Sequence, residues 1–372
     1  MRLVTCAVLL TLAAGIAAAC SAFIPFDEYA GPPVATAAEA GSDGATVDDG
    51  GPVSDGAVDC KDVDLKTDPN NCGACARRCD ACDAGRCPLE ILVDGTSAVT
   101  ALHLGLRDPD AGSTAIYFVR GSGTLARVDL DGGRYEEALT QGAAPLSFGT
   151  TTGLVASKTD AITVFMRDRF LDAGAVQIVP PRNNLGPLLF EDRNVFWSDD
   201  DGMFWAAVKP DASVSQLSDA SAVAITSAAG TSFWTDGSGL VQRMSTLAPD
   251  SLAPVLNVNG GASSVTGIAI GPKHIYLTQK SQGLLVYDYD GTTAKLARLA
   301  PVADPELVVC DQTHVYVYEA APSLGQRELH RYDLDGQGKL VLSASLGAVR
   351  ALALDATYLY FTDQVRVGRI VK

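Results

Sequence analysis

Six cysteines between Cys60 and Cys87 are the residues of this chain best suited to chemistry. Five of them fall in the 20-residue stretch "DPNNCGACARRCDACDAGRC" (68–87), and Cys60 lies just upstream. Thiolates at this density can hold a metal, carry redox chemistry or pair as disulfides. The choice depends on the compartment, so the N-terminal residues matter first.

The chain begins with the pattern of a secretory signal. Arg2 is followed by an apolar run over 3–19 that ends in small residues, and this run is too short for a dependable membrane span. Because Cys20 follows directly, the segment resembles a bacterial lipoprotein signal, although Ala17 stands where that motif prefers Leu. The resemblance implies a lipid on Cys20. With Ser21 next, it also implies the outer membrane; a secreted protein is the alternative.

Residues 21–59 form a spacer rich in small residues, Pro and Asp. The segment holds eight acidic residues and no Lys or Arg, and so supplies half of the net charge of −16. Such a composition does not bury enough apolar surface to offset the entropy of ordering, so we expect a flexible linker. The overall acidity excludes nucleic acid as a partner, because phosphate backbones require positive charge.

An exported chain meets an oxidising compartment, in which the clustered thiols pair. We expect three disulfides among six cysteines, with all fifteen pairings open: Cys60, Cys72, Cys75, Cys79, Cys82 and Cys87. Zinc binding is the alternative to disulfide pairing, since two C-x-x-C pairs are present. These pairs lie only three residues apart without a nearby histidine, which favours disulfides over zinc.

The cysteine stretch also carries a family resemblance. "DPNNCGACARRC" followed by "CDAGRC" resembles a D-P-x-N-C-G-x-C module of exported proteins from large-genome Gram-negative bacteria, with Ala76 in place of the usual second Gly. The resemblance implies a lipoprotein-like N-terminus ahead of a repeat domain of uncharacterised function. We therefore divide the chain into a signal (1–19), a linker (20–59), a cysteine-rich module (60–88) and a repeat domain (89–372).

A β-rich phrase ending in an aromatic residue recurs through the repeat domain. Its aligned positions are spaced 33 to 46 residues apart: Tyr117, Thr163, Phe196, Phe233, Tyr276, Tyr316 and Tyr360. A period near 40 in short alternating strands is typical of β-propeller blades, each a four-stranded sheet. The sequence therefore predicts an all-β propeller.

The end of the chain bears on the number of blades. The seventh unit stops after its third strand, at "VGRIVK", while an unassigned strand, "LEILVD" (89–94), precedes the first unit. Pairing the two closes the ring and removes an open sheet edge, which predicts seven blades. The phrases "FWSDD" and "FWTDG" resemble YWTD-type propellers, which have six. Six blades with a degenerate second unit is the alternative.

Other candidate residues favour structural roles. Trp197 and Trp234 recur at one blade position and are expected to pack between blades. The Asp-rich turn 199–201 lacks the ligand spacing of a calcium loop, so a solvated turn is favoured. The four histidines are scattered: His103, His274, His314 and His330. His274 and His314 occupy equivalent positions of adjacent blades. Cys310 is expected to be a buried free thiol. We expect no metal and no cofactor.

These observations favour a monomeric, non-enzymatic binding or scaffold protein of the cell envelope, with an unknown protein or glycan partner. A propeller enzyme, such as a metal-dependent lactonase-like hydrolase or a lyase, is the second hypothesis. A purely structural envelope component is the third. The fold alone does not choose among them.

Overall fold

The structure is a computed structural model that describes much of the chain beyond the linker. The described residues are 64–69, 71–72, 82, 85–95, 97–108, 113–121, 123–141, 143–148, 153–158, 161–166, 175–179, 184–191, 194–209, 213–236, 239–245, 252–258, 265–280, 282–321, 326–363 and 365–372. The chain divides into two compact units, Met1–Gly56 and Ala57–Lys372, and all described residues belong to the second. Within these ranges no helix is long and apolar enough to cross a bilayer.

The described strands form seven four-stranded sheets, numbered here along the chain. Sheets 1 and 2 are β2 (Val99–Asp108), β3 (Ser113–Arg120), β4 (Thr124–Asp129) and β5 (Tyr135–Gln141), then β6 (Ala143–Phe148), β7 (Gly153–Lys158), β8 (Ala161–Met166) and β9 (Ala175–Val179). Sheets 3 and 4 are β10 (Leu188–Glu191), β11 (Asn194–Asp199), β12 (Gly202–Ala207) and β13 (Ser215–Ser218), then β14 (Ala222–Ala228), β15 (Thr231–Asp236), β16 (Leu240–Ser245) and β17 (Ala253–Asn257).

The remaining three sheets follow the same order. Sheets 5 and 6 are β18 (Val265–Ile270), β19 (His274–Gln279), β20 (Gly283–Tyr289) and β21 (Ala294–Ala300), then β22 (Pro305–Cys310), β23 (His314–Ala321), β24 (Gln326–Asp333) and β25 (Leu340–Leu346). Sheet 7 is β26 (Val349–Leu354), β27 (Tyr358–Asp363), β28 (Arg366–Val371) and β1 (Glu90–Val93). All pairs are antiparallel, and the weakly patterned unit around Thr163 forms a sheet of its own, sheet 2.

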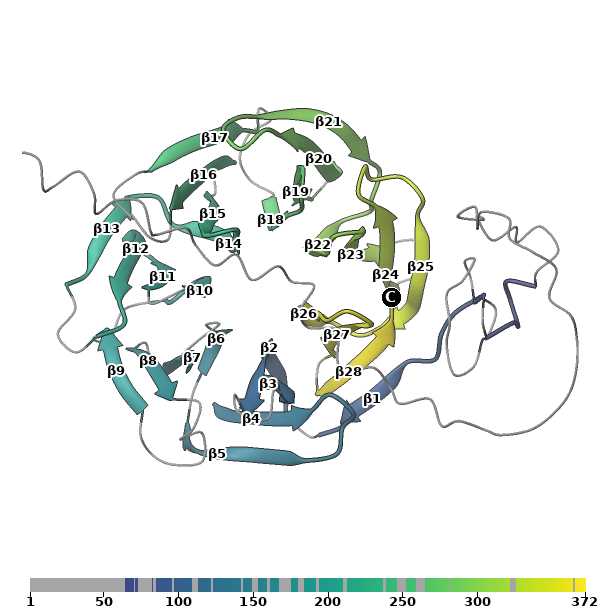
Figure 1. The fold of residues 1–372 in the computed structure, drawn as a ribbon, viewed down its shortest axis with the longest axis horizontal. Coiled ribbons are helices and arrows are strands. Elements are labelled where there is room, and N and C mark those ends of the chain that lie inside the picture. The colour runs from purple at the N-terminus through teal and green to yellow at the C-terminus, as the bar shows by residue number, and fades with distance from the viewer. Residues whose placement is uncertain are drawn as a thin grey trace, which may run out of the picture. The chain divides into compact units, whose positions relative to one another are not determined.

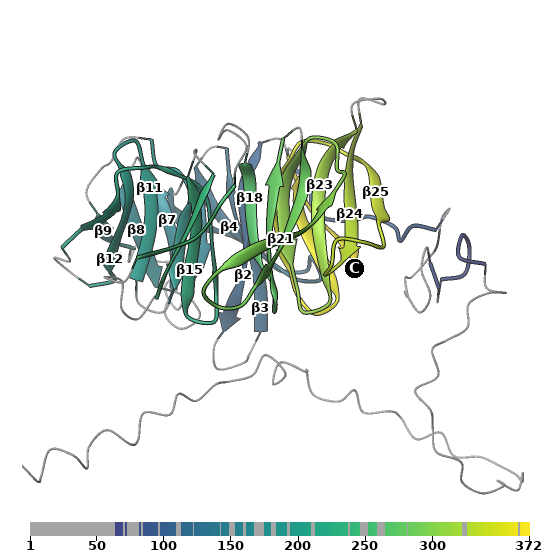
Figure 2. The ribbon, with the colours of Figure 1, turned by 90° about the horizontal axis from the view of Figure 1, so that it is seen from above.

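The sheets stand side by side around a common centre, with their first strands innermost (Figure 1). Successive innermost strands contact one another from β2 through β26, and β26 contacts β2, which closes the circle. Seen from the side, the strands run roughly along the axis of the ring (Figure 2). The all-β propeller predicted from the repeat is confirmed, and the sheet count matches the larger of the two predicted numbers.

The ring is closed by its own N-terminal strand. β1 pairs with β28 in the register Glu90↔Arg369 and Ile91↔Gly368, so sheet 7 takes its outer strand from the start of the domain. Arg369 strengthens the junction, because its Nε donates to Glu90 Oε2 at 2.7 Å and its guanidinium lies over the Tyr358 ring at 4.3 Å. The pairing predicted for "LEILVD" is confirmed.

The hydrophobic core lies between neighbouring sheets. Successive side chains of a strand point to opposite faces, so each second strand serves two interfaces. In sheet 6, Val315 and Val317 belong to the core shared with sheet 5, whereas Tyr316 and Tyr318 belong to the core shared with sheet 7. The recurring aromatic residues of the sequence are therefore the inter-sheet core, and Trp197 and Trp234, both fully buried, occupy it as predicted.

A repeated turn orders the hairpin between the first two strands of sheets 6 and 7. Asp311 Oδ1 accepts hydrogen bonds from the backbone N–H groups of Thr313 and His314, both at 2.8 Å, and Oδ2 accepts from the Tyr316 hydroxyl at 3.1 Å. Asp355 makes the equivalent bonds to Thr357, Tyr358 and Tyr360. The pattern Asp-x-Thr-x-x-Tyr thus fixes both the turn and the first buried aromatic ring.

Candidate functional site

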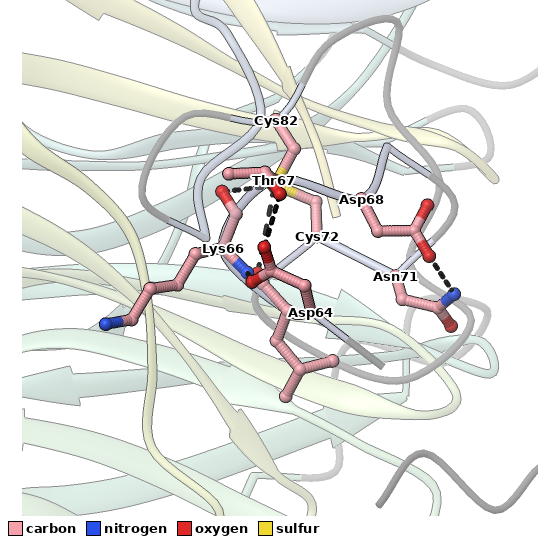
Figure 3. Close-up of a disulfide and its surroundings, with 8 residues drawn as sticks. Asp64, Lys66, Thr67, Asp68, Asn71, Cys72 and Cys82 are labelled. Atoms are coloured by element: carbon pink, nitrogen blue, oxygen red, sulfur yellow. Dashed lines mark hydrogen bonds between the residues drawn. A yellow bond between two sulfur atoms is a disulfide. The ribbon is translucent and has the colours of Figure 1, made fainter. Parts of the chain in front are cut away.

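The cysteine module is held by turns and a disulfide in its described part (Figure 3). Cys72 and Cys82 form a disulfide with a Cα–Cα distance of 5.4 Å, and Cys72 is fully buried. Cys87 is also disulfide-bonded and buried, with a partner outside the described residues. Cys20, Cys60, Cys75 and Cys79 lie outside the described residues, so the predicted lipidation and the full three-bridge framework stay predictions.

Short polar side chains shape the module around that disulfide. Asp64 Oδ1 accepts from the Lys66 backbone N–H at 2.9 Å, Asp64 Oδ2 accepts from the Thr67 hydroxyl, and Gly85 N–H donates to Lys66 O at 3.0 Å. The hydrogen bonds from Thr67 and Lys66 lower the pKa of Asp64 below its ordinary value. These contacts are local turn contacts, and they give the module a structural role (Figure 3).

The two equivalent histidines each pair within their own sheet. His274 Nε2 lies 3.3 Å from Asp288 Oδ1 across β19 and β20, and His314 Nε2 lies 4.0 Å from Asp333 Oδ1 across β23 and β24. Burial lowers the pKa of His314. The repeat therefore places each histidine opposite an aspartate of the next strand, at the same end of its sheet.

His103, on the innermost strand β2, is desolvated by the surrounding protein, which lowers its pKa to about 4.

The Asp-rich turn of sheet 3 caps a hairpin. Asp199 Oδ1 accepts from the Asp201 backbone N–H at 2.9 Å, and Asp200 Oδ2 accepts from Asn184 Nδ2 at 2.7 Å. Asp200 and Asp201 are exposed, as a solvated turn requires, but Asp199 is buried at 3% exposure. The prediction of a solvated turn is therefore wrong for Asp199, which ends β11 and whose backbone oxygen accepts a hydrogen bond from Ser221, just before sheet 4.

Among the described residues, a cluster of ionisable side chains that could hold a metal ion lies in sheet 6. Glu319 is near the end of β23, directly opposite Glu328 on β24, and His330 follows two residues later on the same face of β24. Glu319 also shares a face with Val315 and Val317, so this group faces sheet 5. We call Glu319, Glu328 and His330 the Glu–Glu–His cluster.

Two carboxylates of this cluster approach one imidazole nitrogen. His330 Nε2 contacts Glu319 Oε1 and lies 2.9 Å from Glu328 Oε2. The side chains are 0% exposed for His330, 3% for Glu319 and 20% for Glu328. Glu319 has further partners: Lys339 Nζ lies 2.6 Å from Oε1, and the Ala303 backbone N–H donates to Oε2 at 3.0 Å.

The electrostatics of the cluster follow from burial and these partners. Desolvation acts to raise the pKa of Glu319, but the hydrogen bonds and charges of His330 and Lys339 outweigh it, so the pKa lies below its ordinary value. Burial, together with the negative charges of Glu319 and Glu328, raises the pKa of Tyr332. The cluster therefore concentrates ionisable side chains inside an otherwise apolar interface.

Sequence reasoning missed this site. It treated His330 as one of four scattered histidines, although the alternation in "RELHRYD" places Glu328 and His330 on one strand face. The position of Glu319 opposite Glu328 requires the register of the β23–β24 hairpin. An acidic residue three positions after the recurring Tyr316, combined with a Glu-x-His strand, was the available signal.

The ring of four-stranded sheets defines the repeat domain as a β-propeller, and comparisons with solved structures agree. U3-55K is 12% identical over 76% of this chain and 98% of its own, with a TM-score of 0.57. The RRP9 WD40 repeats are 12% identical over 76% and 97%, with a TM-score of 0.58. The computationally designed Ika8 protein is 12% identical over 77% and 100%, with a TM-score of 0.53.

At this identity the likeness establishes the fold alone: the repeat domain is a propeller of the kind that WD40 repeats form. No protein-family model matches the chain. No curated protein matches it either.

Proposed function

We propose that this chain is an exported, lipid-anchored binding protein whose propeller presents one face of its ring to a protein or glycan partner. The signal-like N-terminus with Cys20, the acidic spacer and the resemblance of the cysteine module support the location. The closed ring supports the role, because a rigid frame that displays variable loops is suited to recognition.

The observation that carries the binding role is a repeated β-bulge near the start of the innermost strands. In the described residues, the pairing of the first two strands shifts register at this point in sheets 1, 2, 4, 5, 6 and 7. Bulges of this kind re-aim side chains. Thr100, Val223 and Arg350 lie at the shifts in sheets 1, 4 and 7, and all three are exposed next to buried neighbours. We call this side of the ring the bulge face.

The bulge face also receives the connections that lead from one sheet to the next. Val223 is 42% exposed, a large value for valine on an innermost strand. Arg350 adds a positive charge, and Thr100 a hydroxyl. A mixed apolar, cationic and hydroxyl surface fits a protein or glycan better than a polyanion. The partner surface is therefore proposed to surround the ring axis on this face.

The location is tested by intact mass spectrometry of the full chain, purified from membranes of a Gram-negative host. The expected result is a mass that begins at Cys20 and includes added acyl mass, lost in Cys20→Ser together with membrane association. Cys310→Ser is the matched control, because it removes a cysteine from the propeller and leaves acylation intact. An unacylated protein in the soluble fraction would overturn the anchor.

The binding role is tested by placing a photo-crosslinking amino acid at Val223, with Leu296 on the outer strand β21 as the control. Both side chains are exposed, at 42% and 49%. Crosslinks to one envelope component from position 223, and none from 296, support a partner on the bulge face. Equal yields from both positions contradict it and favour the purely structural hypothesis.

The enzyme hypothesis placed acidic ligands at the central funnel. The Glu–Glu–His cluster lies on the second and third strands of sheet 6, between sheets 5 and 6, rather than on the innermost strand β22. This placement suits a site that stabilises or regulates the ring more than one that turns over a substrate at the axis. Binding therefore remains the proposed function.

A further inference from the structure

We propose that Glu319, Glu328 and His330 bind a divalent transition-metal cation, with Zn²⁺ the best fit, at the interface of sheets 5 and 6. This inference is independent of the partner and of the lipid anchor. It rests on three features of the cluster: how its ligand atoms converge, how deeply they are buried, and which neighbouring polar groups lack a partner.

The convergence of ligand atoms is the first feature. One oxygen of each carboxylate and one nitrogen of His330 all lie within 4.8 Å of one another. An imidazole ring nitrogen carries at most one hydrogen, so His330 Nε2 can donate to only one of the two carboxylates that approach it. A cation among the three atoms satisfies both carboxylates and the nitrogen lone pair together.

Burial is the second feature. Glu319 is 3% exposed and Glu328 20%, and two carboxylates this close in a largely buried position repel each other unless positive charge lies between them. Lys339 supplies part of that charge to Glu319, but its side chain is 43% exposed. Because the Lys339 stem is long and half in solvent, its ammonium can withdraw when a cation binds.

The third feature is a pair of buried polar groups without a hydrogen-bond partner. Among the described residues these include His330 Nδ1 and the Tyr332 hydroxyl. Tyr332 is 3% exposed, and its ring centroid lies 6.2 Å from that of His330. A buried polar group that no protein atom satisfies requires an explanation. Tyr332 lies on the same face of β24 as His330, and we expect its hydroxyl to bond a water held by the proposed cation, since metal sites of three protein ligands commonly hold one.

The ligand set selects the class of cation. One imidazole and two carboxylates suit zinc and its neighbours among the transition metals, which accept nitrogen and oxygen together. Calcium and magnesium prefer an all-oxygen shell of six or more ligands. Three protein ligands on two adjacent strands leave the fourth tetrahedral position open to water.

The test is a titration of the metal-free full chain, disulfides intact, with Zn²⁺ against a competing chelator. One equivalent is expected to bind. His330→Gln and Glu328→Gln should each weaken binding by more than the roughly 10- to 100-fold that loss of an outer-shell partner costs. Glu306→Gln is the matched control, because Glu306 is a carboxylate of the same sheet whose partner is Arg327. Lys339→Met should tighten binding, since it removes a competitor for Glu319.

A spectroscopic measurement on the wild-type chain keeps the proposal falsifiable if a variant does not fold. Zinc X-ray absorption should show one imidazole with oxygen ligands, and Co²⁺ should give visible bands without thiolate charge transfer. Absence of saturable binding would overturn the site. So would wild-type affinity in His330→Gln, or sulfur in the first shell, which would assign the metal to the cysteine module.

Discussion

Sheets 5 and 6 are neighbours with the same strand order, yet the same positions carry opposite chemistry. Glu319, Glu328 and His330 of sheet 6 correspond by register to Gln279, Gly283 and Leu285 of sheet 5. Gln279 and Leu285 are each 3% exposed, so both sheets bury these positions against the preceding sheet. Because sheet 5 packs without charge there, the propeller frame does not require it. The charges of sheet 6 therefore point to a purpose beyond packing.

The same pair of sheets differs at the first hairpin. Sheet 6 has Asp311, which caps the turn and accepts from the Tyr316 hydroxyl, where sheet 5 has Gly271. A Cβ at Gly271 would lie 2.9 Å from the Tyr276 ring, whose hydroxyl donates instead to Leu334 O at 2.8 Å. Sheet 5 thus closes its turn by ring packing, and sheet 6 by a carboxylate.

The largest expected difference in stability between the two sheets follows removal of one charged side chain of the cluster. In metal-free buffer, Glu319→Ala should lower the free energy of unfolding by about 3–5 kcal/mol, because the Ala303 N–H and Lys339 lose their carboxylate partner and His330 keeps only Glu328. Gln279→Ala, the sheet 5 control, should cost about 1 kcal/mol. Chemical denaturation measures both, and equal losses would contradict the contrast.

The second-largest effect on stability is expected when the first turn of sheet 6 is converted to that of sheet 5. Asp311→Gly should cost about 2–3 kcal/mol at pH 7, since hydrogen bonds to a charged acceptor are lost. Burial acts to raise the pKa of Asp311, but hydrogen bonds from Lys372, Thr313 and His314 together lower it below 3.8. The stabilisation is thus complete above that ordinary value and declines as pH falls further. Unfolding at pH 7 and pH 3 should show the wild-type advantage shrinking, and an advantage that grows on acidification would contradict this account.

Replacing the whole cluster should cost less than breaking it. The triple variant Glu319→Gln, Glu328→Ala and His330→Leu approximates sheet 5, and its stability in metal-free buffer should lie within about 2 kcal/mol of wild type, because no buried charge is left unpaired. Zinc should no longer stabilise it. If the triple variant is less stable than Glu319→Ala, the charged side chains are required for the stability of sheet 6.

The smallest effect is expected at Cys310, which corresponds to Ile270 in sheet 5. Burial raises the pKa of the Cys310 thiol to about 12, so little thiolate is present at pH 8. Native protein should resist iodoacetamide while unfolded protein is labelled, as peptide mass mapping would show. Cys310→Val should change the free energy of unfolding by less than about 1.5 kcal/mol, and rapid native labelling would identify a reactive thiol instead.

The repeat could be predicted from sequence because its signal is local. Tyr276, Tyr316 and Tyr360 recur beside apolar residues, and each marks a second strand that must bury both faces. The closing strand 89–94 followed from counting strands. The cluster could not be derived in the same way, since it depends on which residue of β23 faces Glu328 and on which sheet that face meets. Both facts arise from register and packing order, which composition does not reveal.

Closure of the ring by β1 also constrains when the domain can fold. The bond between Glu90 and Arg369 joins residues 279 positions apart, so the last interface cannot form until nearly the whole chain is available. Contacts of such long range slow folding and leave strand edges open in the meantime. During synthesis, sheet 7 is therefore the last sheet to be completed, because β1 has no partner until β28 has emerged.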